Sequence, residues 1–447
     1  MSSSENKMIT GDVTKEYIRF VVPSILGLLA ISSAGVVDAI FVGKYVGATA
    51  LAAVSIMMPV IYLFFGICVM IVIGSVTMSG KAIGENDTSK ASDLFSKSII
   101  IVSFYAMICS LLTFFFAENL AYVMGAKEEV IELSAGYIQT IAPFMLFMGL
   151  NYILANFTRI DGAPNLASAG LIIMSMSNIL LDYLFIKVFG LGIGGAALAS
   201  GLGHLIGTVF LASRFMISKS KIKLIKPRGS WKDLINACCN GFSEFVNEIS
   251  GGLVIFVFNW ILMLEFGANG VAAFTIVNYI LWLSVMVGYG NAEALSSLVS
   301  VNYGARQKER VNSLVKVSIS FSTVFGALLM LTLFRFSGEA VGFFLDENEQ
   351  VITSLSLVIV MATLPALFFN GINIALTGYF TGVQAAKQSS MIALSRSLIL
   401  PIMLALVLWQ MFGVNSAFYA IPIAEILTFL LATALYFKKR PMRFICN

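Results

Sequence analysis

The sequence predicts an all-α membrane protein with twelve transmembrane helices in two six-helix bundles, related by an internal pseudo-two-fold repeat. Composition, a series of apolar segments and the repeat itself support this fold class. Of the 447 residues, 58% are hydrophobic and only 12% are charged. A soluble domain has about a quarter of its residues charged. The shortage of charge therefore excludes a soluble globular protein.

The apolar segments define the predicted helices. A helix that crosses a bilayer needs about 20 predominantly apolar residues. Segments of this kind follow one another with no soluble domain between them. We place the twelve spans near 15–42, 50–79, 93–117, 131–158, 165–188, 192–217, 232–264, 270–303, 311–336, 349–380, 387–411 and 414–439.

The two halves of the chain resemble each other. A shift of 220 residues lays GATALAA (47–53) over GANGVAA (267–273), and a shift of 222 lays Pro143 over Pro365. We therefore expect an N-terminal bundle over 1–217, a cytoplasmic basic linker over 218–231 and a C-terminal bundle over 232–447. Because six is even, both halves have the same orientation, and two such bundles with a cleft between them suit alternating access.

The basic residues predict the orientation. In the predicted outer segments we find only Lys44, Lys127, Lys187 and Arg335, while nearly all other lysines and arginines lie on the side of the two termini. Cytoplasmic loops carry the excess of positive charge. We therefore expect both termini in the cytoplasm of a prokaryote, with the chain in its inner (plasma) membrane. The basic run 219–232 lies between two spans, so it is interpreted as an inner-leaflet anchor and not as a nucleic-acid site.

One carboxylate lies deep in the first predicted span. Asp38 stands near the end of the apolar run that begins at Pro23, and a charge at such depth costs a few kcal/mol, on the order of 2.5–3.5. Such residues usually face a polar interior and have a function. The alternative is that Asp38 only caps the turn at 43–47.

Further polar residues of the first half are predicted at similar depth. Asn178 and Asp182 are spaced i, i+4, which places them on one helical face. Ser200 lies about eight residues into the next span from the same side, so its depth agrees within a turn or two. Asn151, on the fourth span, offers a further side-chain oxygen and is placed deeper in the membrane than these residues.

Oxygen ligands of this kind suit a hard cation such as Na⁺, with Asp38, Asn178 and Asp182 as its ligands. Two nearby carboxylates in a poorly hydrated site also repel each other, which favours binding of a proton. The sequence therefore predicts a coupling site for H⁺ or Na⁺ and no other cofactor. A polar network that only ties helices together is the competing interpretation.

The second half has its own intramembrane charges. Glu244 and Glu248 share one face of the seventh span, and their depth suits the wall of a central cleft that binds a cationic substrate. A structural role for this pair stays open. Arg396 and Glu425 lie on adjacent spans and are expected to neutralise each other.

Several motifs together resemble the multidrug and toxic compound extrusion (MATE) family of secondary transporters. They are VDAIFVGKYVGATALAAVS after Pro23, GENDTSKA after the second span, NYILANFTRIDG, and SNILLDYLFI followed by GIGGAALAS. The resemblance covers residues 15–440. It implies two six-helix bundles that form a V, and export of organic cations in exchange for inward Na⁺ or H⁺.

The resemblance also implies site residues, with departures. Asp38, Asn178 and Asp182 match a first-half cation site, Ser200 stands where Thr is usual, and Asn151 matches less securely. No acid occurs between Gln350 and Thr381 of the tenth span, and the seventh opens GFSEF without the Pro found in many members. These departures argue against a coupling site in the second half and favour one in the first.

Two other functions compete with drug export. A flippase for lipid-linked saccharide shares this architecture, but Glu244 and Glu248 do not suit an anionic cargo. An intramembrane enzyme or a receptor lacks support, because the chain shows no metal triad or nucleophile–base pair and His204 is its only histidine. We therefore expect a transporter and not an enzyme, with small organic cations and membrane lipid as partners, functioning as a monomer.

Overall fold

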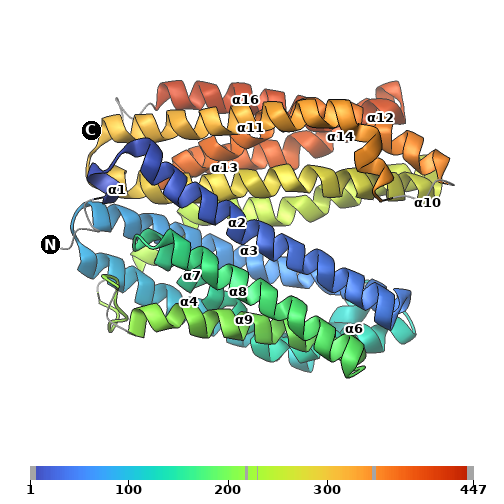
Figure 1. The fold of residues 1–447 in the computed structure, drawn as a ribbon, viewed down its shortest axis with the longest axis horizontal. Helices are drawn as coiled ribbons and strands as arrows, with labels where there is room; N and C mark the ends of the chain where they lie inside the picture. The colour runs from blue at the N-terminus through green and yellow to red at the C-terminus, as the bar shows by residue number, and fades with distance from the viewer. Residues whose placement is uncertain (1–6, 217–219, 229, 345–348, 440–447) are drawn as a thin grey trace. The chain divides into compact units, whose positions relative to one another are not determined.

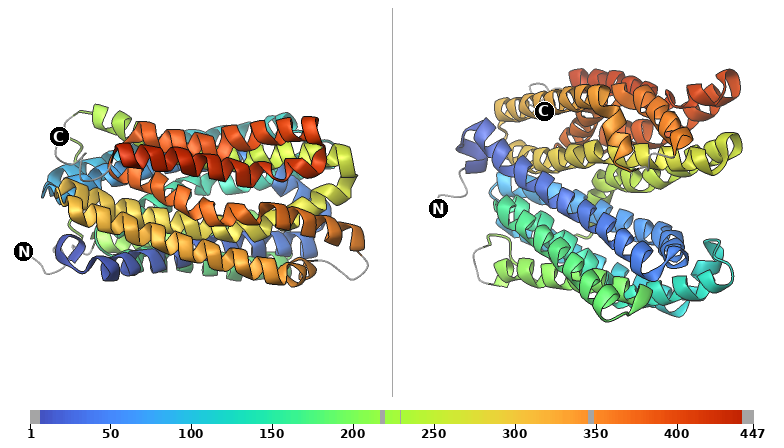
Figure 2. Two further views of the ribbon diagram at one scale, coloured as in Figure 1. Left: turned by 90° about the horizontal axis from the view of Figure 1, so that it is seen from above. Right: turned by 45° about the vertical axis from the view of Figure 1, so that its right-hand side comes forward.

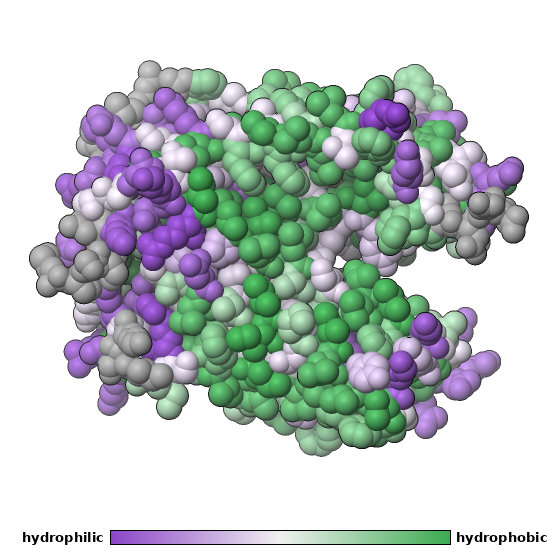
Figure 3. Space-filling model, viewed as in Figure 1, coloured by the Kyte–Doolittle hydropathy of each residue, from purple (hydrophilic) through white to green (hydrophobic). Residues whose placement is uncertain are grey.

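In the computed structural model, the described residues are 7–216, 220–228, 230–344 and 349–439. Parts of the basic run, including Lys219, lie outside them. Secondary structure in the described part is entirely helical, and apolar side chains cover the middle of the helices while hydrophilic ones gather at their ends (Figure 3). This distribution matches an apolar belt between two aqueous faces.

Eleven helical stretches of the described residues are long and apolar enough to cross a membrane. One of them, α10 (Lys232–Gly304), has 73 residues, with a non-helical backbone at Gly267 (φ 62°, ψ −149°). At about 1.5 Å per residue, such a length is far more than one bilayer crossing. Gly267 therefore separates the seventh and eighth predicted spans. The all-helical membrane fold that the sequence predicts is confirmed.

The chain divides into two compact units. Unit 1 comprises 1–8 and 22–241, and unit 2 comprises 9–21 and 242–447. The helices of unit 1 run alongside one another (Figure 1, Figure 2). The helices up to the linker, of which residues 9–21 in α1 and α2 belong to unit 2, are α1 (Lys7–Thr10), α2 (Val13–Phe41), η1 (Val42–Val46), α3 (Ala48–Gly84), α4 (Thr88–Phe115), α5 (Ala117–Val123), α6 (Glu129–Ile141), η2 (Ala142–Phe144), α7 (Met145–Ile160), α8 (Pro164–Asp182), η3 (Tyr183–Val188) and α9 (Gly192–Met216).

Unit 2 is built in the same way around its own apolar core. Phe258 stacks on Phe274 with ring centroids 5.0 Å apart, and both rings are almost fully buried. The helices after α10 are α11 (Lys308–Gly342), α12 (Gln350–Gly382), α13 (Ala386–Leu394), η4 (Ser395–Ile399), α14 (Leu400–Phe412), α15 (Val414–Ala417) and α16 (Ala420–Lys438).

The first turns of α10 belong to unit 1 because they pack backbone to backbone against α3. A Cβ on Gly74 would lie 1.8 Å from the carbonyl oxygen of Ala237, and one on Gly241 would lie 1.9 Å from that of Met70. Only glycine permits such close approach. Likewise, the start of α2 belongs to unit 2, where the Tyr17 hydroxyl donates to Asn291 Oδ1 at 2.6 Å.

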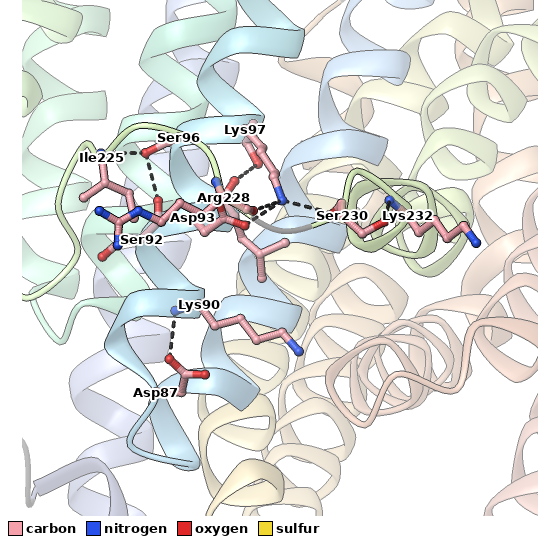
Figure 4. Close-up of polar contacts among 12 residues, drawn as sticks. Asp87, Lys90, Ser92, Asp93, Ser96, Lys97, Ile225, Arg228, Ser230 and Lys232 are labelled. Carbon is pink, nitrogen blue, oxygen red and sulfur yellow. Dashed lines mark hydrogen bonds and ion pairs between the residues drawn. The ribbon is translucent and has the colours of Figure 1, made fainter.

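The described part of the linker is fastened to α4 as an extended segment (Figure 4). The N–H groups of Lys223 and Ile225 donate to the hydroxyls of Ser92 and Ser96 at 3.1 and 2.9 Å. Near its end, the buried ammonium of Lys97 donates to the carbonyl oxygens of residues 228 and 230. Lys97 also pairs with Asp93 at 2.6 Å, and Asp93 accepts from the N–H of residue 228. We call Ser92, Asp93, Ser96 and Lys97 the linker latch.

Candidate functional site

The helices that carry Asp38 and Asp182 place the two residues at one height. Within unit 1, α2 and α8 run in the same direction (Figure 1). They approach closely at Gly27, where an added Cβ would lie 3.0 Å from Leu171 Cδ1. Asp38 follows Gly27, and Asp182 follows Leu171, by the same number of residues. At a rise of about 1.5 Å per residue, both carboxyl groups lie roughly 16 Å beyond the contact.

The carboxyl groups of Asp38 and Asp182 meet. They are within hydrogen-bonding reach of each other. Two ionised carboxylates have no proton to share, and in the described part of the chain no protein donor reaches Asp38 Oδ1 or either oxygen of Asp182. Asp182 is fully buried. Such a pair is costly unless a proton or a metal cation lies between the oxygens.

The residues around the carboxylate pair are consistent with binding of a proton or a metal cation. The buried phenol of Tyr137, on α6, lies within electrostatic range of both carboxylates. Asp38 does not serve as a cap for the following turn, because η1 has no side-chain cap and Asp38 Oδ1 has no donor among the described residues. The capping alternative is therefore not supported by the structure.

The amide and hydroxyl predicted beside the carboxylates are also adjacent to each other. Asn178 Nδ2 donates to Ser200 Oγ at 3.3 Å, which joins α8 to α9 one turn before Asp182. The helices can approach this closely because α9 has Gly203 at the contact. A Cβ there would lie 3.1 Å from Asn178 Cβ and 3.0 Å from the carbonyl oxygen of Met174.

Asn151 lies one helical turn farther along the same groove of α9. A Cβ on Gly207 would lie 2.5 Å from Asn151 Nδ2, and this nitrogen has no hydrogen-bond partner in the described part of the chain. Asn151 is nearly fully buried. A buried amide N–H group without a partner is costly, and a bound water that accepts its hydrogen bond would satisfy it. The five first-half residues thus form a column from the carboxylate pair to Asn151.

Replacing Gly207 by Ala is expected to reduce transport several-fold without unfolding the protein. The new methyl group would displace the Asn151 amide and would also press on Met174 Cβ, 2.9 Å away. Over-packing of this kind typically costs about 1–3 kcal/mol. The measurement is efflux from proteoliposomes beside the thermal stability of the purified protein. The matched control is Gly194→Ala on the same helix, where nothing lies within 4 Å of an added Cβ. Equal transport by both variants would contradict a role for this part of the column.

In unit 2, the predicted pair lies in a cluster of carboxylates. Glu248 is within electrostatic range of Glu244 and of Glu293 on the second half of α10. Glu244 accepts a hydrogen bond from Asn247 Nδ2 at 3.2 Å. Both glutamates are half-buried. Whether they line a substrate cleft stays a prediction, and their geometry supplies negative charge that a cation would neutralise.

The predicted pairing of Arg396 and Glu425 is confirmed. Their side chains are buried, with Arg396 Nη1 3.6 Å from Glu425 Oε1. Glu425 also accepts from the amides of Asn370 and Asn373 at 2.8 and 2.6 Å. Arg396 donates in turn to Asn247 Oδ1 at 3.3 Å. Because Asn247 also donates to a glutamate of the carboxylate cluster, this amide links the ion pair to the cluster.

Sequence reasoning missed several residues that build the first-half site. Tyr137 gave no signal, because an aromatic residue in a membrane helix is ordinary. Gly203 and Gly207 were not singled out either, because glycine is common in membrane helices and the sequence does not show which side chains face each one. The role of each of these residues depends on which helix it faces. That neighbour is decided by packing between segments that are distant in the sequence.

The family model MatE matches the chain twice, over residues 23–184 and 250–407. This double match agrees with the predicted internal repeat. Among characterised proteins, the chain is 26% identical over 437 residues to the multidrug export protein MepA of Staphylococcus aureus strain N315. The alignment covers 96% of this chain and 94% of that protein.

Solved structures show the same fold over the whole chain. An outward-facing multidrug resistance MATE family transporter of the MOP superfamily superposes with a TM-score of 0.92 at 20% identity, covering 100% of both chains. A MOP superfamily transporter from Pyrococcus furiosus, described by a reverse polarity of its binding pocket that suggests a different function, gives a TM-score of 0.91 at 21% identity. That alignment covers 100% of this chain and 99% of the other.

Proposed function

The chain belongs to the MatE family, so it is a multi-pass membrane transporter and not an enzyme, and we propose that it exports lipophilic organic cations in exchange for inward H⁺ or Na⁺. The single observation that carries this proposal is the contact between the carboxyl groups of Asp38 and Asp182. Because the two carboxylates together need a cation, they form a site that can bind the ion from one side of the membrane and release it to the other.

The coupling step follows from elementary electrostatics. When a proton or Na⁺ occupies the pair, the repulsion between the carboxylates is relieved and α2 and α8 are held together. When the ion leaves, the buried charge of Asp182 and the half-buried charge of Asp38 face each other across the contact, and the helices are driven apart. A ligand can shift a conformational equilibrium only by its differential affinity for the two states, and this pair supplies such a difference. Asn178, Ser200 and Asn151 are the further oxygen-bearing groups of the proposed site.

The test is dye efflux from proteoliposomes that hold the purified protein, under an imposed H⁺ gradient or Na⁺ gradient applied one at a time. Efflux of a fluorescent organic cation that depends on one gradient supports the proposal and identifies the ion. Efflux that proceeds equally with no ion gradient, or that requires nucleotide hydrolysis, would overturn it.

Organic cations are the proposed substrates because unit 2 concentrates negative charge. We propose that Glu244 and Glu248 attract the substrate through this charge. The name of the Staphylococcus aureus relative, a multidrug export protein, supports drugs as the cargo. Aromatic and methionine side chains of a membrane transporter suit flat lipophilic cations as well.

Replacing Glu248 by Gln is expected to raise the KM for a cationic dye severalfold, because one carboxylate of the cluster is lost. The maximal rate and the ion dependence should change little. The measurement is the concentration dependence of dye efflux, with Glu339→Gln as the matched control, since Glu339 is exposed in the same unit. A variant with the KM of the wild type, or with altered ion dependence only, would contradict substrate attraction by this cluster.

A flippase for lipid-linked saccharide is the second candidate, and the reverse pocket polarity described for the Pyrococcus furiosus structure shows why the cargo must be tested. A phosphorylated lipid carries negative charge, which Glu244 and Glu248 would repel. Translocation of such a lipid by the protein, with no dye efflux, would reverse the ranking.

We also propose the arrangement of the protein in its membrane. The bias of basic residues supports cytoplasmic termini in the inner (plasma) membrane of a prokaryote. The two matches to the family model support a transporter made of two repeated halves. We also propose that it acts as a monomer. Labelling of single cysteines introduced near either terminus, from each side of sealed vesicles, tests the orientation.

A further inference from the structure

Two short π-helical segments directly follow the carboxylate pair. Asp182 is the last residue of α8, and η3 begins at Tyr183; α2 carries Asp38 one turn before its end at Phe41, and η1 follows. A π-helical turn is rare and is frequently found at functional sites. Here both helices that supply the carboxylates change their winding at the same place.

The two π-helical segments are joined by rings and one ammonium group. Lys187 Nζ, on η3, lies 4.9 Å from the ring centroid of Tyr183 and 5.6 Å from that of Tyr45 on η1. Phe41 stacks on Tyr45 at 5.6 Å and meets Tyr183 edge to face at 6.5 Å. These distances are typical of cation–π and aromatic contacts. We call Phe41, Tyr45, Tyr183 and Lys187 the aromatic clasp.

The clasp lies one turn beyond the carboxylate contact on the same two helices. Phe41 is at i+3 from Asp38, so both side chains project from one face of α2. Tyr183 is the residue after Asp182. Contact between these two rings therefore fixes the spacing of the helix ends at which the carboxyl groups meet. A shift of Tyr183 relative to Phe41 would change the distance between the carboxylates.

We propose that Lys187, held between Tyr45 and Tyr183, is a positioning residue that fixes the separation of Asp38 and Asp182 and so sets the affinity of the pair for the coupling ion. The inference rests on the proposed coupling function of that pair. Lys187 acts through the two tyrosine rings and does not itself bind the ion. The competing explanation is that exposed tyrosines and a lysine form part of an ordinary interfacial belt. Such a belt would not require one ammonium group to be shared between rings of two helices.

The experiment measures the concentration of coupling ion that gives half-maximal dye efflux, together with the maximal rate, in proteoliposomes. Lys187→Met and Tyr183→Leu are expected to shift that concentration by about two- to fivefold, as loss of one or two exposed cation–π contacts implies. Lys187→Arg and Tyr183→Phe keep the cation and the ring, and each should lie close to the wild type. Lys127→Met, another exposed lysine of unit 1, is the matched control and should leave the value unchanged.

The outcomes separate the clasp from the coupling site. The inference is overturned if Lys187→Met and Tyr183→Leu keep the ion dependence of the wild type, or if they lower only the maximal rate. It is also overturned if Lys187→Arg shifts the value as much as Lys187→Met. Asp38→Asn is measured in the same vesicles: if it is inactive while the clasp variants behave as wild type, only the positioning role fails. If Asp38→Asn retains ion-driven efflux, the proposed coupling function itself fails.

Discussion

Replacing either Asp38 or Asp182 by Asn is expected to abolish ion-driven efflux while leaving the protein folded in the membrane. An asparagine has almost the same shape as an aspartate, but it cannot take up a proton or neutralise Na⁺. Because the two carboxyl groups meet, loss of one also removes the repulsion that makes the other depend on an ion. Efflux in proteoliposomes should fall to the level of protein-free vesicles for each single variant.

A charge-matched control provides a further check on the coupling pair. Glu118→Gln removes an equal charge from an exposed position of unit 1 and should transport as the wild type does. Gradient-driven efflux by the Asp38→Asn or Asp182→Asn variant at the wild-type rate would contradict the coupling proposal. The comparison requires equal amounts of variant and wild-type protein in the vesicles.

Replacing Arg396 by Met is expected to destabilise unit 2 by about 3–5 kcal/mol, because Glu425 would then be a buried carboxylate without its counter-charge. The two asparagine amides that contact Glu425 are neutral and cannot replace the guanidinium. The measurement is the thermal unfolding of the purified protein in detergent, where a clear fall of the melting temperature is expected.

The matched experiments separate the charge pair from the loss of a side chain. Arg335→Met removes an exposed guanidinium of unit 2 and should change the melting temperature little. The double change Arg396→Met with Glu425→Met should recover much of the lost stability, since an apolar pair of similar size is often as stable as a buried ion pair. Equal melting temperatures for Arg396→Met and Arg335→Met would contradict the neutralising role.

The helices could be predicted closely because the bilayer imposes their length. The first predicted span, 15–42, corresponds to α2 and η1, and the tenth, 349–380, to α12 (Gln350–Gly382). The change to π-helical winding after Phe41 and Asp182 was not predicted. The change in winding does not interrupt the apolar segments, so the hydrophobic pattern of the sequence does not indicate it. The break at Gly267 within α10 falls between the two predicted spans, and its glycine adopts the positive φ that such a turn requires.

The residues of the candidate site could be predicted where their depth in the membrane was enough to identify them. Asp38, Asp182 and Asn178 stood out because each is polar at a similar distance from a span end. Their direct neighbours could not be predicted, because Tyr137, Gly203 and Lys187 owe their roles to which helices pack together. Depth is a one-dimensional property that the sequence contains, whereas the face of a helix that meets a neighbour depends on the packed bundle.

The linker latch predicts which positions of α4 and of the linker should be conserved among relatives. Ser92, Asp93 and Ser96 hydrogen-bond to the linker through its backbone N–H groups, and Lys97 through backbone carbonyl oxygens. Lys97 also contacts one linker side chain, because its ammonium lies 5.7 Å from the centroid of the Trp231 ring. Any residue other than proline offers the same N–H groups at 223, 225 and 228. Natural selection should therefore preserve the four latch positions of α4, while linker side chains other than the aromatic one at 231 vary freely. An alignment of relatives in which the linker is constant and α4 is variable would contradict this expectation.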